Sequence, residues 1–300
     1  MQKYYLVGSP VSHSLSPAMH NLAFQTLGID AAYGLCEANI SELPNAIRKL
    51  KAENASGWNV TMPDKQAMCE LCDVLSPEAA ISRSVNTIKN IDGKLYGYTT
   101  DGAGFLRAAK ENGFSEGMRN TVLLGTGGAA VSILIACAMN GAEKITVFYN
   151  RESSAQKIIP VIERLQHYLS TGNLSENAST PDAQELHLPE ITLASLHDAD
   201  TLNSCIRQAG LLVNATNVGM AGSHNENASP LADASCLTAG TDVFDAIYNP
   251  RKTVLLSQAE AAGLKTVNGL PMLLYQGAES FRIWTGCEMP TEQIRKSIFV

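Results

Sequence analysis

Apolar and polar positions alternate in two ways along the first hundred residues. Apolar runs of about four to eight residues indicate buried strands, and apolar positions three or four apart indicate one face of a helix. The pattern predicts strands at 4–7 and 57–60 and a hairpin at 85–100. It predicts helices at 18–27, 41–54 and 63–73. Gly28 should end the first helix, and Asp92-Gly93 should form the turn of the hairpin. These elements make one unit of about 100 residues, a usual domain size.

The rest of the chain continues the alternation of strand and helix. Strands are predicted at 121–124, 144–149, 210–213 and 241–244, and helices up to residue 140 and at 198–208, 251–262 and 270–285. From residue 167 to 188 the sequence turns polar and irregular, and we interpret 170–185 as a surface loop or insertion. There is no internal repeat. The whole pattern predicts an α/β protein with mainly parallel sheets.

The composition narrows the functional class. Of 300 residues, 45% are hydrophobic and 17% are charged, and 22 basic against 29 acidic residues give a net charge of −7. This excess of negative charge argues against nonspecific binding to nucleic acid or anionic membranes, because both need clustered Lys and Arg. No apolar run approaches the roughly 20 residues that span a bilayer, and no basic and apolar leader opens the sequence. We therefore expect a cytoplasmic protein.

Cysteines and histidines give no sign of a disulfide framework or a metal site. The seven cysteines, an odd number, are scattered along the chain. Cys69 and Cys72 form a CxxC pair, but no second pair completes a zinc site, and we interpret both as buried helix residues. The six histidines have no ligand spacing such as HExxH. No metal is expected.

Lys65 is the first candidate for chemistry. It ends the stretch NVTMPDK at residues 59–65 and follows a proline that should open the helix at 63–73. A cation there meets the positive end of the helix macrodipole, which disfavours the ammonium form and suits a lysine that transfers a proton. Because a lone lysine is usually a solvated surface residue, this interpretation depends on the neighbouring motifs.

A glycine-rich turn follows the strand at 121–124. It consists of Gly125, Thr126, Gly127, Gly128 and Ala129 and leads into a helix. Glycines at such a junction let a pyrophosphate approach backbone N–H groups at a helix N-terminus, where the dipole favours negative charge. The spacing departs from GxGxxG, and a turn without a ligand is the alternative. Together with the next strand, this turn indicates a Rossmann-type dinucleotide-binding domain.

The residues after the strand at 144–149 should select the cofactor. Asn150 stands where an acidic residue would hold the ribose hydroxyls of NAD, and Arg151 can pair with the 2′-phosphate of NADP. Glu152, which follows at once, keeps NAD open as the alternative. The expected cofactor is therefore NADP, with NAD possible.

Several motifs together resemble those of the shikimate dehydrogenase family. They are GSPVSHSLSP at 8–17 with His20-Asn21, NVTMPDK at 59–65, Val85-Asn86-Thr87, Thr100-Asp101-Gly102, the GTGGA turn at 125–129, NATNVGM at 214–220, DAIYNP at 245–250 and MLLYQ at 272–276. The matches occur in order over essentially the whole chain.

The resemblance implies reversible reduction of 3-dehydroshikimate to shikimate by NADPH, with quinate or NAD used by some members. It implies a substrate domain at 1–102, completed by the last helices at 271–300, a Rossmann-type domain at 103–270 and a cleft between them. Lys65 and Asp101 would form the proton-transfer pair. Substrate contacts carried over by position are Ser14, Ser16, Thr61, Asn86, Tyr248 and Gln276, and cofactor contacts are Gly125, Thr126, Gly127, Gly128, Ala129, Asn150, Arg151, Thr216 and Gly269. We expect a monomer or homodimer without nucleic-acid or membrane partners.

Two of these roles have structural alternatives. Ser14 and Ser16 would point to one face of an extended segment and hold one carboxylate, or they could serve turn chemistry before Pro17. Asp101 precedes a predicted helix at 102–112 and could be its N-cap.

The sequence departs from the family pattern at three places. Thr99 stands where the family usually has Asn, and Arg83-Ser84 where it usually has Gly-Ala. Ser153, Ser154 and Ala155 are neutral where the family has a basic partner a few residues past Arg151, which weakens the preference for NADP. Two alternatives stay open: a relative acting on quinate or another cyclic polyol acid, such as aminoshikimate, with NAD, and a nucleotide-binding regulator without turnover. The presence of both Lys65 and Asp101 argues against the regulator.

Overall fold

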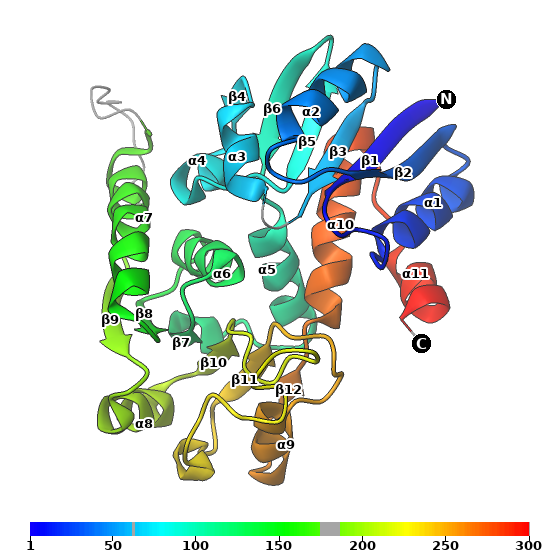
Figure 1. Cartoon of the computed structure of the whole chain (residues 1–300). Coiled ribbons are helices and arrows are strands. Elements are labelled where there is room, and N and C mark those ends of the chain that lie inside the picture. Colours follow the sequence, from blue (N-terminus) through cyan, green and yellow to red (C-terminus); the bar gives the residue numbers. More distant parts are fainter. Residues whose placement is uncertain (62–63, 175–186, 300) are drawn as a thin grey trace. The chain divides into compact units, whose positions relative to one another are not determined.

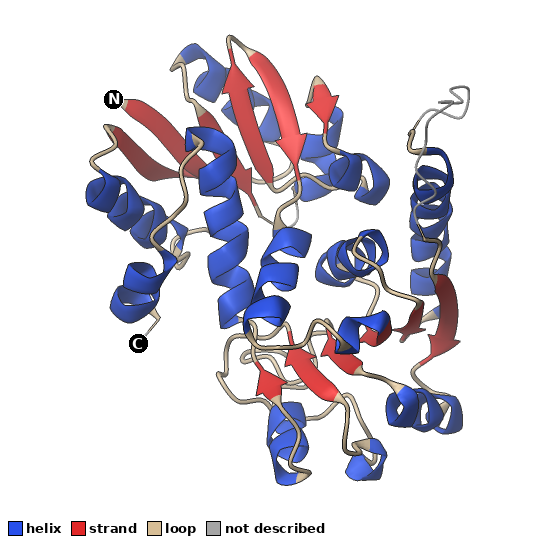
Figure 2. Cartoon of the chain, turned by 180° about the vertical axis from the view of Figure 1, so that it is seen from behind, coloured by secondary structure: helices blue, strands red, loops and turns tan. Residues whose placement is uncertain are grey.

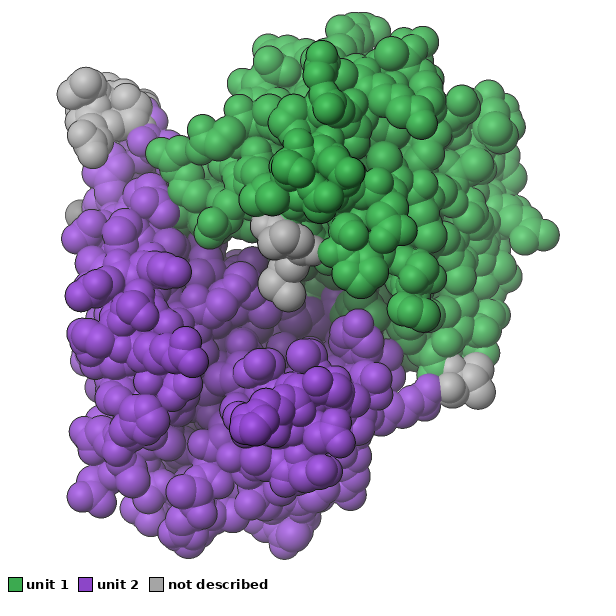
Figure 3. Space-filling model, in the orientation of Figure 1, with its two compact units in different colours: residues 1–104, 273–300 green, residues 105–272 purple. Residues whose placement is uncertain are grey.

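The chain folds into two compact units. The structure is a computed structural model, and it describes residues 1–61, 64–174 and 187–299. Unit 1 contains Met1–Gly104 and Leu273–Val300, and unit 2 contains Phe105–Met272 (Figure 3). Each unit is built on its own sheet with helices around it, which confirms the predicted α/β class (Figure 1). None of the helices in the described ranges is long and apolar enough to cross a bilayer.

Unit 1 is organised around a mixed six-stranded sheet with the order β2-β1-β3-β5-β6-β4. The strands are β1 (Gln2–Gly8), β2 (Ala31–Glu37), β3 (Gly57–Val60), β4 (Val74–Leu75), β5 (Thr87–Ile91) and β6 (Lys94–Tyr98). β1 pairs parallel with β2 and β3, whereas β5 pairs antiparallel with β3 and β6. The predicted hairpin is confirmed, and Asp92 and Gly93 form its turn with positive φ angles.

Helices cover both faces of this sheet (Figures 1 and 2). They are α1 (Ser16–Leu27), α2 (Leu43–Ala52), α3 (Lys65–Glu70), α4 (Pro77–Ser82), the first turn of α5 (Asp101–Glu111), most of α10 (Leu270–Thr285) and α11 (Thr291–Ile298). On one face, α2, α3 and α4 pack against alternate strand residues, among them Val7 and Trp58. Because successive side chains of a strand point to opposite faces, the residues between these belong to a second core.

The second core of unit 1 is aromatic. The ring of Tyr4 stacks at a centroid distance of 5.4 Å on Phe24 of α1 and 4.8 Å on Trp284 of α10. The Trp284 indole N–H donates to the Ile88 carbonyl at 2.8 Å. Gly57 leaves room for this indole, since a Cβ there would lie 2.6 Å from Trp284 Nε1. Through Trp284, α10 is therefore part of the interior of unit 1.

Unit 2 contains a six-stranded sheet in which each strand runs parallel to its neighbours. The strands are β7 (Asn120–Leu124), β8 (Lys144–Tyr149), β9 (Glu190–Ser195), β10 (Leu211–Asn214), β11 (Asp242–Asp245) and β12 (Thr266–Val267), in the order β12-β11-β10-β7-β8-β9. The chain starts in the middle with β7 and then builds outward in both directions. Such doubly wound sheets bind ligands at the carboxyl ends of the strands beside the reversal point, here between β7 and β10.

The helices of unit 2 complete its core. They are the rest of α5, α6 (Gly128–Met139), α7 (Glu152–Thr171), α8 (Ala199–Gln208) and α9 (Val254–Ala261). Apolar residues of α8 and α9 form a core with alternate residues of the sheet. α6 is buried on most sides, which explains its almost continuous apolar sequence. Phe105 of α5 contacts Phe244 of β11 edge to face, with centroids 5.0 Å apart.

Several elements differ from the sequence prediction. The pattern did not predict β2, β4, α4, α7, β9, β12 and α11. The expectation of irregular structure from residue 167 is wrong at its start, because α7 continues to Thr171 and ends at Gly172 in the left-handed conformation. Residues 175–185 of the loop predicted at 170–185 lie outside the described residues. The helix predicted at 63–73 is shorter: α3 covers Lys65–Glu70, and residues 62–63 also lie outside the described ranges.

Candidate active site

Lys65 and Asp101 form an ion pair in unit 1. Each is the first residue of a helix, α3 and α5 respectively. Lys65 Nζ lies 2.7 Å from Asp101 Oδ2, and the two side chains are 22% and 16% exposed. The pair is accessible to a small molecule yet shielded enough to strengthen its attraction. Because an ammonium group has three donors, Lys65 keeps two for a ligand oxygen.

Asp101 is held from a second side by Asn86. Asn86 Nδ2 donates to Asp101 Oδ1 at 2.9 Å. The backbone N–H of Thr100 lies 2.9 Å from Asn86 Oδ1, and because an N–H can only donate, this contact fixes which way the amide faces. The N-cap alternative for Asp101 is wrong, since the residue lies within the first turn of α5 and its carboxylate accepts from Lys65 and Asn86.

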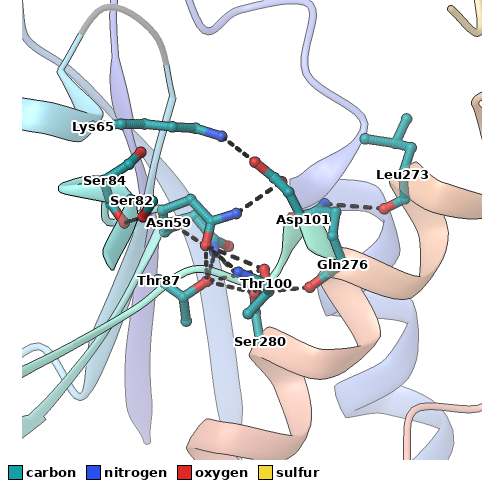
Figure 4. A network of polar contacts seen from close by, with 11 residues as sticks. Asn59, Lys65, Ser82, Ser84, Thr87, Thr100, Asp101, Leu273, Gln276 and Ser280 are labelled. Carbon is teal, nitrogen blue, oxygen red and sulfur yellow. Dashed lines mark hydrogen bonds and ion pairs between the residues drawn. The ribbon is translucent and has the colours of Figure 1, made fainter. Parts of the chain in front are cut away.

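A buried layer of polar side chains contacts Asn86 and includes Asn59, Thr87 and Ser280, which Figure 4 shows. Asn59 Nδ2 donates to the Asn86 carbonyl at 3.0 Å and to Thr87 Oγ1 at 2.9 Å. Ser280 of α10 lies 2.7 Å from Thr87, measured between hydroxyl oxygens. Tyr33 donates to Asn59 Oδ1 at 2.8 Å, and burial raises the pKa of this phenol well above its usual value, so it remains a donor. This layer limits the movement of Asn86 and, through it, of Asp101.

The sequence analysis did not identify this buried layer. Ser280 and Asn59 are 221 residues apart, and an ordinary serine on a helix gives no motif. The NVT and VNT motifs include Asn59 and Thr87, but only the three-dimensional contacts reveal that both support Asn86.

The segment with Ser14 and Ser16 is not extended, so the expectation that both side chains share one strand face is wrong. A turn precedes α1, in which the Ser14 N–H donates to the Val11 carbonyl at 3.1 Å. Ser14 Oγ accepts the Ser16 N–H at 3.2 Å, and Ser16 begins α1. The turn alternative is therefore confirmed for Ser14. A role of both hydroxyls in holding a carboxylate stays a prediction.

The other expected substrate contacts lie in different places. Thr61 is half-buried just after β3, and its N–H donates to the Val7 carbonyl at 3.1 Å. Gln276, on α10, donates through Nε2 to the Leu273 carbonyl at 3.0 Å. Both belong to unit 1, together with Lys65 and Asp101. Tyr248 belongs to unit 2 and is 46% exposed.

The glycine-rich turn of unit 2 leaves an open space at the start of α6. Gly127 is the N-cap residue and Gly128 the first residue of the helix, and a Cβ at either would meet no heavy atom within 4 Å. Gly125 is different: its φ is 108°, and a Cβ would lie 2.9 Å from the Ala215 carbonyl oxygen. The N-cap residue is a glycine, so it has no side chain that could cap the N–H groups of α6. An anionic group fits this helix end, because the N–H groups there need acceptors.

The end of β8 holds the residues expected to select the cofactor. Arg151 is exposed at the N-cap of α7, and Asn150 precedes it. Glu152 accepts a hydrogen bond from the Tyr149 hydroxyl, and this bond raises the pKa of Tyr149. His197, which the sequence analysis did not single out, lies at the end of the adjacent strand with Nε2 3.1 Å from the Asn150 carbonyl oxygen. Because Glu152 already accepts a hydrogen bond from Tyr149, Arg151 is the more available of the two charged residues for contact with a cofactor.

The last two expected cofactor contacts lie on neighbouring loops. The Thr216 hydroxyl donates to Asn214 Oδ1 at 2.7 Å, just beyond β10. Gly269 approaches the loop after β11 so closely that a Cβ would lie 2.1 Å from the Ala246 carbonyl oxygen. Close backbone packing is therefore a sufficient reason for glycine at 269, and its contact with a cofactor stays a prediction.

The departures from the family pattern have clear positions. Arg83 ends α4 with a φ of 52°. Its guanidinium is exposed and lies 3.8 Å from the Glu70 carboxylate. Thr99 Oγ1 is buried and has no hydrogen-bond partner among the described residues.

Comparison with protein families identifies two matching segments. Residues 6–88 match the model of the shikimate dehydrogenase substrate binding domain. Residues 269–299 match that of the shikimate 5′-dehydrogenase C-terminal domain. The first segment includes Lys65 and Asn86, and the second includes Gln276 and Ser280.

Individual relatives match over almost the whole chain. A shikimate dehydrogenase (NADP(+)) of Alkaliphilus metalliredigens is 39% identical over 98% of this chain and 94% of its own length. A quinate/shikimate dehydrogenase of Escherichia coli is 38% identical over 98% of this chain and 96% of its own length. The crystal structure of shikimate 5-dehydrogenase from Listeria monocytogenes with shikimate and NAD has a TM-score of 0.87 and 35% identity, covering 99% of this chain and 96% of that one.

Proposed function

The chain belongs to the shikimate dehydrogenase family, and from this premise we propose that it reversibly reduces 3-dehydroshikimate to shikimate with NADPH, Lys65 and Asp101 handling the proton. The observation that carries the proposal is the Lys65–Asp101–Asn86 cluster in the unit that matches the family's substrate binding domain. Unit 1 would bind the substrate, and unit 2 would bind the cofactor.

The chemistry explains the residue types. When an alcohol is oxidised, its C–H bond breaks and the electron pair leaves as hydride, while the O–H proton goes to a base. NADP+, when bound, accepts that hydride. Lys65 would contact the reacting oxygen, taking its proton when neutral and returning it in the reverse direction. Asp101, 2.7 Å from Lys65 Nζ, would hold the amine in place and stabilise its charged form.

Asn86 supports this arrangement. Its Nδ2 would be shared between Asp101 and a ring hydroxyl, since an amide NH₂ has two donors. Ser14, Ser16, Thr61, Gln276 and Tyr248 complete the proposed substrate contacts. Ser14 and Ser16 would present hydroxyl groups to the carboxylate of the substrate, which the net charge of −7 does not otherwise attract.

The cofactor would bind at the carboxyl ends of the strands of unit 2. The open space at Gly127 and Gly128 supports a pyrophosphate there, next to Gly125, Thr126 and Ala129. Arg151, with Asn150 beside it, would pair with the 2′-phosphate of NADP, and the engagement of Glu152 by Tyr149 supports NADP over NAD. Thr216 and Gly269 would contact the remainder of the cofactor.

A second candidate is oxidation of quinate, with NAD as a possible cofactor. A relative with 38% identity is a quinate/shikimate dehydrogenase, and Thr99 replaces the usual Asn two residues before Asp101. The substrates share a ring that carries a carboxylate and hydroxyl groups, so the same Lys-Asp pair could serve both.

The deciding experiment measures initial rates of cofactor reduction for shikimate and quinate, each with NADP+ and NAD+. Fast turnover of shikimate with NADP+ is the expected result, and competition between the two acids then ranks them. Quinate turnover alone would replace the proposed substrate. Cofactor binding without turnover of either acid would instead support the nucleotide-binding regulator.

A further inference from the structure

One buried carboxylate in unit 2 has no role in the chemistry described so far. Asp245 is the last residue of β11 and is completely buried. Its partner in the strand register is Asn214, the last residue of β10, which is buried to the same extent. Asn214 is in turn in register with Leu124, the residue before the glycine-rich turn. Asp245 therefore lies at the ligand-binding edge of the sheet, beneath the loops that leave it.

Asp245 accepts hydrogen bonds from three different segments. Asn214 Nδ2 donates to Oδ1 at 3.0 Å, and the Ile247 backbone N–H donates to the same oxygen at 3.1 Å. The Thr253 hydroxyl, at the N-cap of α9, donates to Oδ2 at 2.7 Å. A buried carboxylate with three donors from three segments holds those segments together, because its loss would take an acceptor from all three donors at once.

Two of these three bonds, those from Asn214 and Ile247, lead to proposed ligand contacts. Asn214 Oδ1 accepts the Thr216 N–H at 3.1 Å and its hydroxyl at 2.7 Å. Ile247 precedes Tyr248, and the Ile247 carbonyl accepts the Gly269 N–H at 2.9 Å. Each of the three proposed contacts is thus connected to Asp245 through a single intermediate residue. This residue is Asn214 for Thr216, and Ile247 for Tyr248 and Gly269. Ala215 also contacts the residue before the glycine-rich turn, since its N–H donates to the Leu124 carbonyl at 2.9 Å.

We propose that Asp245 is a positioning residue for cofactor binding, which in its ionised form holds the loops of Thr216, Tyr248 and Gly269 in the arrangement that binds NADP. This inference rests on the proposed function for the identity of the ligand. Asp245 itself touches neither substrate nor cofactor.

The ionisation of Asp245 should be visible near neutral pH. Burial raises the pKa of Asp245 to about 6, and its three hydrogen bonds oppose the rise. The groups that face it are the Asn214 amide from β10, the Thr253 hydroxyl from α9 and the Ile247 N–H; within the described ranges no charged side chain contributes. Asp242, at the other end of β11, interacts with Lys265 instead, and Lys252 pairs with Glu260 on the surface.

Protonation has opposite effects on loop order and on folding stability. Below pH 6 the neutral acid accepts less strongly, so the loops loosen and NADP binding weakens. The raised pKa means that the folded chain binds this proton more tightly than the unfolded chain does. The contribution of Asp245 to stability therefore rises as the pH falls through 6. If Asp245 had a purely structural role, its protonation would not weaken NADP binding and at the same time increase the stability of the fold.

The test measures the Kd of NADP+ by isothermal titration calorimetry between pH 5 and 8 for the full chain, for Asp245→Asn and for Asp242→Asn as a control on the same strand. Asn has the shape of the neutral acid and should fold. At pH 7.5 we expect the Kd of Asp245→Asn to be about five to ten times that of the wild type, which is the effect of one hydrogen bond. At pH 5 the ratio of the two Kd values should approach one. The ratio cancels the titration of the ligand itself.

The outcomes separate this inference from the proposed function. A ratio near one at pH 7.5, or a raised ratio that does not change with pH, overturns the role of Asp245. An equal effect of Asp242→Asn also overturns it, because that would be a general response to loss of charge on β11. Shikimate turnover by the wild type is measured in parallel. Its absence with NADP+ binding intact removes the proposed substrate alone, whereas loss of NADP+ binding by the wild type overturns both.

Discussion

At the scale of single residues, the arrangement of Lys65, Asp101 and Asn86 makes each side chain dependent on another. Asp101 uses one oxygen for Lys65 and the other for Asn86, and the Thr100 N–H fixes the Asn86 amide. Replacement of Asp101 would therefore release Lys65 and leave the Asn86 NH₂ without one of its acceptors. In the proposed mechanism the reacting oxygen contacts Lys65, whose two remaining donors are directed to no other residue of the cluster.

Lys65→Ala should abolish most turnover and leave cofactor affinity unchanged. General acid–base catalysis contributes about 10²- to 10⁴-fold, and kcat should fall by that factor. Lys65 lies in unit 1, so the Kd of NADP+ should stay within about twofold of the wild type. Lys94→Ala is the matched control, since Lys94 is a lysine of unit 1 that lies over the Tyr96 ring. An unchanged kcat in Lys65→Ala would remove this lysine from the mechanism.

Asp64, the neighbour of Lys65, should reduce stability at neutral pH. It is completely buried, both carboxylate oxygens lack hydrogen-bond partners among the described residues, and burial raises its pKa. The folded chain therefore binds this proton more tightly than the unfolded chain, and stability is lost as the pH rises through the raised pKa. Asp64→Asn should increase Tm at pH 7.5, by roughly 2–4 °C for a gain of about 1 kcal/mol.

The gain should be smaller at pH 4 than at pH 7.5, because protonation of Asp64 in the wild type removes the same buried charge. Asp73→Asn is the control, because the Asp73 carboxylate accepts the Leu95 N–H at 2.7 Å and has no such deficit. Thermal unfolding of the three proteins at both pH values tests this. A gain of the same size at pH 4 would show that charge is not its cause.

At the scale of elements, the glycine-rich turn combines two different requirements. Gly125 needs its left-handed φ and the close approach to Ala215, whereas Gly128 starts α6 beside open space. One glycine serves the fold, and the other leaves room for a ligand. The same five-residue stretch thus connects the packing of the sheet with binding.

Substitution separates the two requirements. Gly128→Ala should keep Tm or raise it slightly, because Ala favours a helix by roughly 1 kcal/mol, but its methyl group should raise the Kd of NADP+ at least tenfold. Gly125→Ala should lower Tm as well as binding, because the new Cβ would meet the Ala215 carbonyl. Calorimetric titration and thermal unfolding of both variants test the difference. Tight NADP+ binding by Gly128→Ala would place the pyrophosphate elsewhere.

Elements were predictable from the sequence where burial was continuous. β3, β8 and α10 have the predicted limits, and the pattern found both strands of the hairpin. β2 was not predicted because it lies at the edge of the sheet, where exposed and half-buried residues interrupt its apolar run. α7 has buried residues at helical spacing, but Pro160 interrupts the pattern and faces outward.

The candidate site was predictable only where it coincides with motifs. Lys65, Asn86 and Asp101 stand in short distinctive stretches, whereas Ser280 and Asp245 become meaningful through contacts made in the folded chain. The turn at Ser14 was one of two conformations compatible with the same residues, because Ser before a helix suits a turn as well as an extended segment.

At the scale of the whole molecule, the two units can be followed separately in solution. The chain has two tryptophans, Trp58 and Trp284, and both are in the interior of unit 1. Tryptophan fluorescence, excited selectively, therefore reports on unit 1 alone, whereas far-ultraviolet circular dichroism reports on both units. The comparison of the two signals shows whether the units unfold together.

Trp284→Ala should destabilise unit 1 selectively. It removes the stacking on Tyr4 and the hydrogen bond to Ile88, and loss of a buried Trp costs about 3–5 kcal/mol. In a urea titration, the fluorescence of Trp58 should change at a lower urea concentration than the dichroism of unit 2. Cys287→Ala, an exposed position three residues later, should leave the wild-type transition unchanged. Coincident transitions in Trp284→Ala would show that the two units unfold as one.

The discontinuity of unit 1 also has a consequence for synthesis on the ribosome. Residues 105–272 are continuous, so unit 2 has its complete sequence before translation ends. Unit 1 begins first but lacks Ser280 and Trp284 until the residues after 272 have been made. A nascent chain must therefore keep the apolar surface around Tyr4 and Phe24 unpaired while the whole of unit 2 is translated. This is the interval in which the growing polypeptide should depend most on chaperones.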